Sequence, residues 1–495
     1  MDLQKRTDML TAAKKQLSDK SSKTKLHKEG KLSAYELMKL LFDDGSFVET
    51  NAYVKAYVDE IGSSEPAEYE GVVCGYGAID GRLVFTYCQD ASRANGAFSK
   101  AAAEKIAGIY DLALKNGAPV VSIYDSLGAK ITEGIDVLAG YGKVMKKSAS
   151  VKGKIPQVAL VLGNACGATS IIASMSDVAI VCEGASFSQH PANVLVEAGA
   201  DKAIGTAKFV AEQGFVADYT ETPENAVVEA KKILSYLPSN RFDKNYYAGT
   251  TDDANRATPE IASIVSKADY DVHSVIGMIA DNSTYKELYS FKSKSLVTAF
   301  AYINGIPCGI VANNPSVKEG KLSDAALDKA AGFVKLCDSF GISVLTLVGT
   351  KGFDEMCESH GGKICRNAAA LANAYASATV PVVTVNIGEA YGTSYAVMGS
   401  KAIGADMVFA LDSAKIAVLK PSSSVLMMWN EKLAGSKAPI EKRKALEEDW
   451  ELYMSTPILA ANAGQIDDII PSEQLRARIA AALEMLSLKS EFIKL

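Results

Sequence analysis

The sequence predicts an α/β protein made of two tandem copies of one fold. Short apolar runs that suit β-strands alternate with longer windows that suit helices, which is typical of βα units with largely parallel strands. The chain has 495 residues, which is too long for one ordinary core and fits two domains of roughly 200 to 250 residues. The pattern also recurs, because Pro156 and Gly167 are matched 225 positions later (381 − 156) by Pro381 and Gly392. A repeat of strand, helix and turn in one order favours duplication over chance.

The first copy begins with an Asp-Gly turn at residues 80–81. The run "GRLVFTYC" that follows is rich in residues that favour strands, and the alanine-rich window after it favours a helix. The predicted elements, in order, are a strand at 81–88, a helix at 99–117, a strand at 118–125, a helix at 131–149 and a strand at 155–162.

The second copy keeps the same order. Its turn is Asn304-Gly305, at an offset of 224 (304 − 80) from the turn of the first copy. The predicted elements are strand residues at 301–313 on both sides of this turn, a helix at 323–341, a strand at 342–349, a helix at 361–379 and a strand at 380–387.

Residues 1–60 are polar and helical in tendency, and we interpret them as a helical docking arm. The segment before "DDGS" has a helical stripe of apolar residues, which comprises Leu32, Tyr35, Leu37, Leu40, Leu41 and Phe42. We expect an N-terminal domain over residues 1–255, arm included, and a C-terminal domain over 256–495, with a junction near 246–260.

Composition narrows the function classes. Lys and Arg total 52 against 58 Asp and Glu, a formal charge of −6, which disfavours a general nucleic-acid surface and leaves room for a local basic patch. The eight cysteines form no CxxC pair and the four histidines have no metal-ligand spacing. We therefore expect reduced cysteines, no metal site and a cytoplasmic protein. The N-terminus has no apolar signal core, and the uncharged stretch Val158 to Ser176 is broken by glycines, so we expect a strand and a helix there rather than a membrane span.

Two glycine turns are the candidate sites. "GNACGATS" (163–170) and "GEAYGTSY" (388–395) each follow an apolar strand and lead into a helix. The first turn of a helix has unpaired N–H groups at the positive end of the helix dipole, so it can hold an oxyanion without side-chain chemistry. The alternative is that these small residues only permit tight packing of helix on strand.

The ordered segments of the chain resemble the carboxyltransferase subunits of biotin-dependent acyl-CoA carboxylases and decarboxylases, of the propionyl-CoA carboxylase beta and methylmalonyl-CoA or glutaconyl-CoA decarboxylase alpha kinds. The resemblance rests on "HKEGKLSAYELMKLLFDDGSFVE", "QDASRANGAFSKAAAEKI", "DSLGAKITEGIDVLAGYG", "GNACGATS", "STYKELYSFKSKSLVTAFAYINGIPCGIVANNP", "AALDKAAGFVKLCDSFGI" and "AYGTSYAVMGSKAIGAD". It implies two crotonase-like domains per chain, each a ββα superhelix.

The resemblance also implies a reaction, in which a carboxyl group moves between biotin on a carrier partner and the α-carbon of a short-chain acyl-CoA. The N–H groups of Gly167 and Ala168 would hold the thioester enolate, and Thr393 and Ser394 would face the biotin ureido oxygen. The implied substrate-binding residues are Ser126, Gly128, Ala129, Lys130, Cys166, Tyr391, Gly392 and Ala396. The implied biotin-binding residues are Gly352, Phe353, Gly361 and Gly362. The implied partners are a biotin carboxyl carrier protein, a biotin carboxylase or a membrane decarboxylase subunit, and further copies of the chain in a dimer or hexamer.

The chain departs from the family pattern at several positions. Where the family commonly has Ser-Gly-Gly-Ala-Arg, residues 126–130 read Ser-Leu-Gly-Ala-Lys, and Lys130 is our candidate phosphate contact. Ala168 and Thr393 replace glycines, Ala396 replaces an acidic residue, and Lys351 stands before Gly352-Phe353 where the family has proline. The acyl group and the direction of the reaction therefore stay open.

Other motifs are absent or have plainer interpretations. There is no Met-Lys-Met biotinyl site, no phosphate-binding GxxxxGK[ST] loop and no GxSxG elbow, so biotin must come from a partner. Glu133 and Asp136 share a helix face and suit a solvated surface. His190 suits either a substrate contact or an ordinary surface position. Two alternatives remain for the whole chain, namely a biotin-independent crotonase-type decarboxylase or hydratase and a non-catalytic scaffold subunit.

Overall fold

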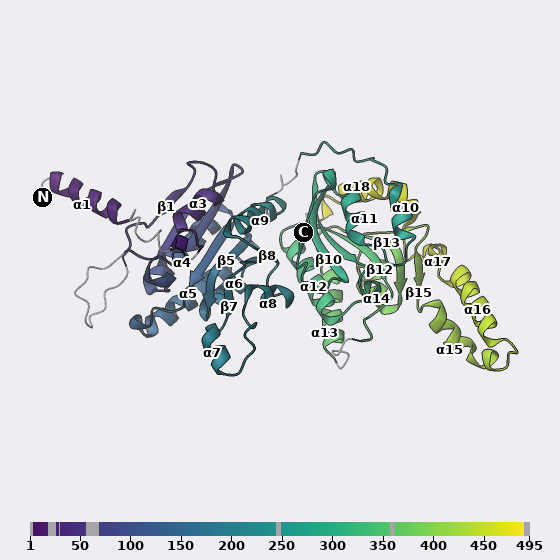
Figure 1. Cartoon of the computed structure of the whole chain (residues 1–495). Helices are drawn as coiled ribbons and strands as arrows, with labels where there is room; N and C mark the ends of the chain where they lie inside the picture. The colour runs from purple at the N-terminus through teal and green to yellow at the C-terminus, as the bar shows by residue number, and fades with distance from the viewer. Residues whose placement is uncertain are drawn as a thin grey trace. The chain divides into compact units, whose positions relative to one another are not determined.

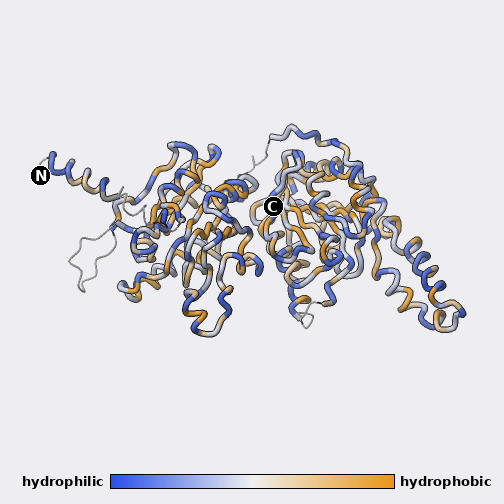
Figure 2. The backbone as a smooth tube through the Cα atoms, in the orientation of Figure 1, coloured by the Kyte–Doolittle hydropathy of each residue, from blue (hydrophilic) through white to orange (hydrophobic). Residues whose placement is uncertain are grey.

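The computed structural model describes residues 3–17, 26–28, 30–55, 69–243, 249–356 and 362–489. The chain divides into two compact units, Met1–Asp243 and Lys244–Leu495. Within the described residues, each unit contains one eight-stranded sheet with helices packed on it (Figure 1). Apolar segments gather in these sheets and in the helices against them (Figure 2).

The sheet of the first unit has an antiparallel edge and a parallel body. Its antiparallel members are β1 (Val48–Thr50), β2 (Val72–Ile79) and β3 (Arg82–Gln89). The parallel body continues from β3 through β4 (Val120–Ser126), β5 (Gln157–Cys166), β6 (Val178–Cys182) and β8 (Asp218–Thr220), with β7 (Ser186–Ser188) paired to the end of β5. The parallel strands therefore end at one edge of the sheet, where ligands of α/β proteins usually bind.

Helices α4 (Lys100–Asn116) and α5 (Ile135–Val151) cover this sheet together with α9 (Pro223–Tyr236). α4 begins after Ser99, whose hydroxyl accepts the Ala102 N–H at 2.9 Å, and it ends at Gly117 with φ +60°. The helix that the sequence predicts from residue 131 begins at Ile135 instead, because residues 131–133 form a 3₁₀ turn before Gly134.

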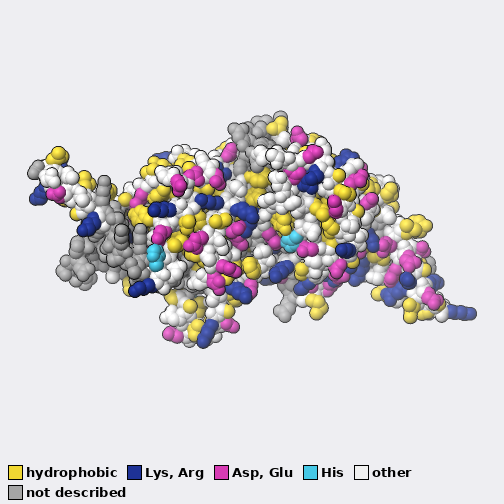
Figure 3. Space-filling model, turned by 45° about the horizontal axis from the view of Figure 1, so that its top comes forward, with side chains coloured by type: hydrophobic (Ala, Val, Ile, Leu, Met, Phe, Trp, Pro, Cys, Tyr) yellow, Lys and Arg dark blue, Asp and Glu magenta, His cyan; other side chains and the backbone are white. Residues whose placement is uncertain are grey.

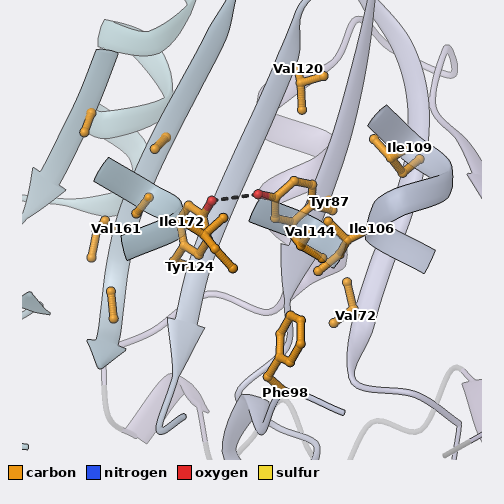
Figure 4. Close-up of a cluster of buried hydrophobic side chains, with 14 of the residues drawn as sticks. Val72, Tyr87, Phe98, Ile106, Ile109, Val120, Tyr124, Val144, Val161 and Ile172 are labelled. Atoms are coloured by element: carbon orange, nitrogen blue, oxygen red, sulfur yellow. Dashed lines mark hydrogen bonds between the residues drawn. The ribbon is translucent and has the colours of Figure 1, made fainter. Parts of the chain in front are cut away.

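The core of the first unit contains a cluster of hydroxyl-bearing rings (Figure 4). The Tyr87 hydroxyl lies 2.6 Å from the hydroxyl of Tyr124 and 3.2 Å from that of Tyr110. Burial raises the pKa of all three tyrosines, so these phenols stay neutral and satisfy each other's hydrogen-bonding capacity.

The second unit repeats this arrangement. Its antiparallel strands are β9 (Tyr285–Leu288), β10 (Leu296–Ile303) and β11 (Ile306–Asn313), and its parallel strands are β12 (Ser343–Thr350), β13 (Val382–Tyr391), β14 (Met407–Leu411), β15 (Lys415–Ala417) and β16 (Asp468–Ile470). α12 (Asp324–Ser339) and α13 (Lys363–Ala376) pack together like α4 and α5. The predicted α/β class and duplicated order of elements are confirmed.

Two helices of the second unit form a hairpin that extends from the sheet, α15 (Pro421–Ala434) and α16 (Pro439–Met454) (Figure 1). Trp429 and Trp450 hold its two arms together, with ring centroids 5.6 Å apart. α17 (Pro457–Asn462) leads from the hairpin back to β16.

The fully buried Arg476, near the C-terminal end of the second unit, contacts residues near the N-terminal end of that unit. It lies at the start of α18 (Leu475–Met485) and contacts Asp281 at 2.8 Å, while its Nε donates to the carbonyl of Asp253 at 3.2 Å. The residues near position 253 therefore pack on the second unit, and the boundary falls after Asp243 rather than at the expected residue 255.

The predicted helical arm is helical in only two described stretches of any length, α1 (Leu3–Leu17) and α3 (Ala34–Leu41). The expectation of a helical arm through residue 60 is wrong at 48–50, because the β-branched Val48 and Thr50 pair with β2 as strand β1. Residues 56–68 lie outside the described ranges.

The predicted reduced cysteines fit their surroundings in the described residues. Cys74, Cys88, Cys166, Cys182, Cys308 and Cys337 are buried and free, and Cys365 is exposed and free. Burial raises the pKa of the Cys74 and Cys308 thiols to about 12, so both stay protonated and inert.

Candidate functional site

In the first unit the glycine turn joins β5 to the short helix α6 (Ala168–Ser174). Gly167 has φ +61°, a conformation that side chains disfavour. Its N–H donates to the Ser188 carbonyl at 3.2 Å and so extends the pairing of β5 with β7. Gly167 was predicted as an oxyanion donor, but its N–H is engaged here, and the first-turn N–H groups of Ala168 and Thr169 are the ones without an acceptor within the helix.

The second unit builds the same turn between β13 and α14 (Gly392–Val397). Gly392 has φ +65°, and a Cβ there would lie 3.2 Å from the Val418 carbonyl. Thr393 is exposed, whereas Ser394 is fully buried with its hydroxyl donating to the Tyr391 carbonyl at 2.6 Å. Ser394 therefore offers its backbone rather than its side chain.

A loop beside each turn also recurs, after β4 in the first unit and after β12 in the second. The Gly128 N–H donates to the Ser126 hydroxyl at 3.1 Å, as the Gly352 N–H donates to the Thr350 hydroxyl at 3.2 Å. The carbonyl of Gly128 accepts from Phe98 N–H at 2.8 Å, and the carbonyl of Gly352 accepts from Leu322 N–H at 3.0 Å. Each pair of equivalent residues is 224 positions apart (352 − 128).

These loops lie next to the turns because their strands are neighbours. β4 pairs with β5 through Ser126 and Ala165, and β12 pairs with β13 through Thr350 and Ala390. The structure thus brings the predicted Ser126, Gly128, Ala129 and Lys130 to the same sheet edge as Cys166, Gly167 and Ala168.

The side chains on the first loop are mostly apolar or internally paired. Leu127 is 58% exposed. The Lys130 ammonium lies 3.3 Å from Glu133, whose side chain is only 5% exposed and accepts the Lys100 N–H at 2.7 Å. The solvated role predicted for Glu133 is therefore wrong, because that carboxylate caps the start of α4. Asp136 pairs with Lys100 at the surface.

The second loop carries a network of charges. Lys351 contacts Glu319 at 2.9 Å and Glu389 at 3.4 Å, and Glu319 also contacts Lys321 at 3.0 Å. Hydrogen bonds from Lys351 and Lys321 lower the pKa of Glu319 to about 2. Burial lowers the pKa of Lys351, but the hydrogen bond to Glu319 and the charge of Glu389 outweigh it and raise that pKa. Lys351 is therefore a fixed positive charge at this loop.

A cavity of about 900 Å³ unites the second loop and the second turn. Its lining includes the predicted residues Gly352, Phe353, Tyr391, Gly392, Thr393 and Ser394. Tyr391 and Gly392 were predicted on the substrate side, yet they share this cavity with residues predicted for biotin. Its remaining walls include residues that the sequence did not single out, namely Tyr395, Val418, Leu419, Lys420, Met454, Leu459 and Gln465.

Two of the residues predicted in the second unit, Ala396 and Gly362, lie apart from this lining. Ala396 is exposed on α14, and Gly362 precedes α13 with φ +138°. Gly361 lies outside the described residues. No sequence motif predicted that Val418 and Met454 would line the cavity. Both come from the segment around the helical hairpin, which is distant in sequence from the loop after β12.

The described part of the chain offers no group of three or more His, Cys, Asp and Glu side chains that could hold a metal ion. His190 is exposed. None of the helices in the described ranges is long and apolar enough to cross a membrane. On the face in Figure 3, basic and acidic side chains are interspersed.

Comparisons with known proteins match nearly the whole chain. Residues 25–495 match the family model described as the carboxyl transferase domain. The methylmalonyl-CoA decarboxylase subunit alpha of Propionigenium modestum is 34% identical over 478 residues, covering 94% of this chain and 92% of that protein. The methylmalonyl-CoA carboxyltransferase 12S subunit of Propionibacterium freudenreichii subsp. shermanii is 36% identical over 477 residues, covering 94% and 91%.

A crystal structure of transcarboxylase 12S, described as a hexamer assembly with methylmalonyl-coenzyme A and methylmalonic acid bound, superimposes with a TM-score of 0.94. It is 34% identical in sequence, and the match covers 99% of this chain and 96% of that one. A single-chain, multi-domain long-chain acyl-CoA carboxylase shares the fold at 23% identity and a TM-score of 0.83. The resemblance drawn from the sequence and its crotonase-like fold are confirmed.

Proposed function

We propose, because the chain belongs to the carboxyl transferase domain family, that it moves a carboxyl group between biotin on a carrier protein and the α-carbon of a short-chain acyl-CoA. The observation that carries this proposal is the cavity of the second unit, which joins Gly352 and Phe353 to Thr393 and Ser394. A methylmalonyl or propionyl thioester fits the relatives' names best, and the direction of transfer depends on the partner.

The first unit serves the acyl-CoA in this proposal. Carboxyl transfer at an α-carbon places negative charge on the thioester oxygen, and N–H groups at the start of a helix stabilise such an oxyanion. With Gly167 N–H bonded to Ser188, we assign the donation to Ala168. The positive φ of Gly167 directs the chain from β5 into α6 and keeps side-chain bulk away from the oxygen.

The second unit serves biotin. The cavity volume of about 900 Å³ lies in the usual range of ligand sites, and its walls at Val418, Leu419 and Leu459 are apolar. These residues fit a small, uncharged bicyclic ring system, whose ureido oxygen would accept from the first-turn N–H groups of Thr393 and Ser394. Biotin, when bound, supplies the nitrogen to which the transferred carboxyl group is attached.

The same proposal includes an assembly of several copies in the cytoplasm. The helical hairpin exposes apolar side chains, including Met427 at 78%, Ile440 at 83% and Tyr453 at 67%, and exposed apolar patches of this kind mark interaction surfaces. We infer a homo-oligomer, from dimer to hexamer, that works with a biotin carboxyl carrier protein. A biotin carboxylase or a membrane decarboxylase subunit completes the reaction.

The decisive assay combines the purified chain, methylmalonyl-CoA and a biotinylated carrier protein. We expect propionyl-CoA to form and the carrier to become carboxylated, as measured by chromatography of the CoA esters and by mass spectrometry of the carrier. The carrier with its biotinyl lysine replaced by arginine is the control and should give no product.

Product formation without any carrier would contradict the biotin role and support a biotin-independent decarboxylase. No turnover of methylmalonyl-, malonyl- or glutaconyl-CoA with several carriers, together with no binding of CoA in calorimetry, would support a scaffold subunit instead.

A further inference from the structure

A second cavity of the second unit, of about 250 Å³, lies where β12 and β13 end. Residues from both strand ends line it, and Lys351 borders both this cavity and the larger one. The lining includes Lys267, Tyr270, Glu319, Lys351, Glu389 and Lys415. The proposed carboxyl transfer uses none of these residues except Lys351, which borders the biotin cavity.

The hydroxyl of Tyr270 is the unusual feature of this cavity. Tyr270 precedes α11 (Val272–Ile279) and is only 5% exposed, yet its hydroxyl has no hydrogen-bond partner among the described residues. The hydroxyl reaches the cavity wall between Gly349 and Gly388, since a Cβ at either glycine would collide with it. A buried hydroxyl without a partner is costly, which indicates that something else satisfies it.

In the first unit, the equivalent place is filled by a side chain whose hydrogen-bonding partners come from the protein itself. The residue equivalent to Gly349 is Asp125, 224 positions earlier (349 − 125). Its carboxylate lies against Gly163, accepts the Asn164 N–H at 2.9 Å and pairs with Lys31 at 2.7 Å. The first unit therefore fills this place with a fully partnered acid, and the second unit fills it with an unpartnered phenol.

The charges around the cavity indicate the kind of ligand. Three lysines line it, Lys267, Lys351 and Lys415, against two carboxylates, Glu319 and Glu389. Both carboxylates contact Lys351, and Lys415 pairs with Glu451, which lies outside the lining. Burial and the charge of Glu389 raise the pKa of Tyr270, so its hydroxyl keeps the proton that it can donate.

We propose that this cavity binds a small oxyanion of the size of bicarbonate or phosphate. The Tyr270 hydroxyl is the donor, and Lys267 is the lining lysine that has no carboxylate partner among the described residues, whereas Lys351 and Lys415 are already paired with carboxylates. The volume admits such an ion together with several waters, each of which occupies about 30 Å³ of liquid volume. The cavity shares Lys351 with the biotin cavity, but the proposal of an oxyanion site does not depend on the proposed carboxyl transfer.

The test compares Tyr270→Phe with Tyr375→Phe in the full-length protein. Both remove one buried phenol oxygen from the second unit, but the Tyr375 hydroxyl already pairs with Thr346 at 2.7 Å. Dissociation constants for sodium bicarbonate and for sodium phosphate are measured by calorimetry, against sodium chloride at equal ionic strength. We expect Tyr270→Phe to weaken the binding of the preferred oxyanion by about tenfold or more, and Tyr375→Phe to leave it unchanged.

Thermal unfolding gives an independent measurement. In chloride, Tyr270→Phe should unfold at the same temperature as the wild type or higher, because it removes an unpartnered hydroxyl, whereas Tyr375→Phe should unfold lower. The oxyanion should stabilise the wild type and Tyr375→Phe but not Tyr270→Phe. A response to bicarbonate alone or to phosphate alone identifies the ion. Equal responses of all three proteins, or no response beyond that to chloride, would overturn the proposal and leave water as the occupant.

Discussion

In the first unit the loop after β4 presents Leu127 to solvent, whereas the equivalent loop after β12 in the second unit holds Lys351 between Glu319 and Glu389. The backbone hydrogen bonds of the two loops are the same, residue for residue, at Gly128 and Gly352. Backbone geometry has therefore been kept after the duplication while side chains have diverged. The shared part suits a common task, the holding of an oxyanion by N–H groups, and the divergent part suits two different ligands.

The largest effect is expected when a bulky side chain is added to each of the two glycine turns separately. Gly167→Val should impair reactions of the acyl-CoA with little effect on carrier binding, and Gly392→Val should do the reverse. Each should lower kcat by about 100- to 1000-fold, because valine disfavours the positive φ of the glycine and so displaces the neighbouring N–H groups that hold the oxyanion. Steady-state kinetics with varied acyl-CoA and varied carrier separates the two effects.

Gly464→Val is the matched control, because Gly464 also has a positive φ, +68°, but has open space around it. It carries the same backbone strain without touching either turn, so it should retain activity. Equal losses in all three variants would mean that strain, rather than the oxyanion turns, explains the effect.

A smaller effect is expected when the second loop receives the residue of the first. Lys351→Leu leaves Glu389 without its ammonium partner beside the cavity, so a ligand that carries a carboxyl group meets an uncompensated negative charge. We expect KM for the carboxylated carrier to rise about tenfold, or ~1.4 kcal/mol, with KM for the acyl-CoA unchanged. Lys420→Leu, at another position of the same cavity, is the control. Equal changes in both variants would indicate a general charge effect instead.

The smallest predicted effect concerns the pH dependence of the second unit. Hydrogen bonds to Glu287 at 3.0 Å and Asp271 at 2.6 Å raise the pKa of His273 to about 9 against the burial that lowers it, from the ordinary value of 6.5. Because the folded-state pKa is the higher one, this stabilisation is complete below pH 6.5 and is lost as the pH rises through about 9.

His273→Gln should remove this pH dependence and lower stability at pH 6 by about 1 kcal/mol, a value reduced for solvent screening of a side chain that is 32% exposed. Urea unfolding of both proteins at pH 6 and pH 9.5 measures the difference. A wild type that is equally stable at both values would contradict the prediction.

The sequence was sufficient to predict the helices and strands and the duplication of the fold, because apolar periodicity and paired turns are local signals. Gly167 and Gly392 were identifiable for the same reason, since a strand that ends in glycine before a helix is visible in the letters. Tyr270 and Glu133 were not, because their roles depend on what packs against them. Val418 and Met454 reach the cavity from a segment far along the chain, and no periodicity indicates that approach.

The buried Arg476 has a consequence for how the protein is made. Its partners Asp253 and Asp281 lie about two hundred residues earlier, so the second unit is closed by contacts of long sequence separation, which slow folding. On the ribosome the first unit can fold as soon as it emerges. The second must wait for α18 before Asp281 gains its arginine partner, although the Asp281 carboxylate can already accept the N–H groups of Asn304 and Gly305. A chain that ends before Arg476 would therefore lack the residue that closes its second unit.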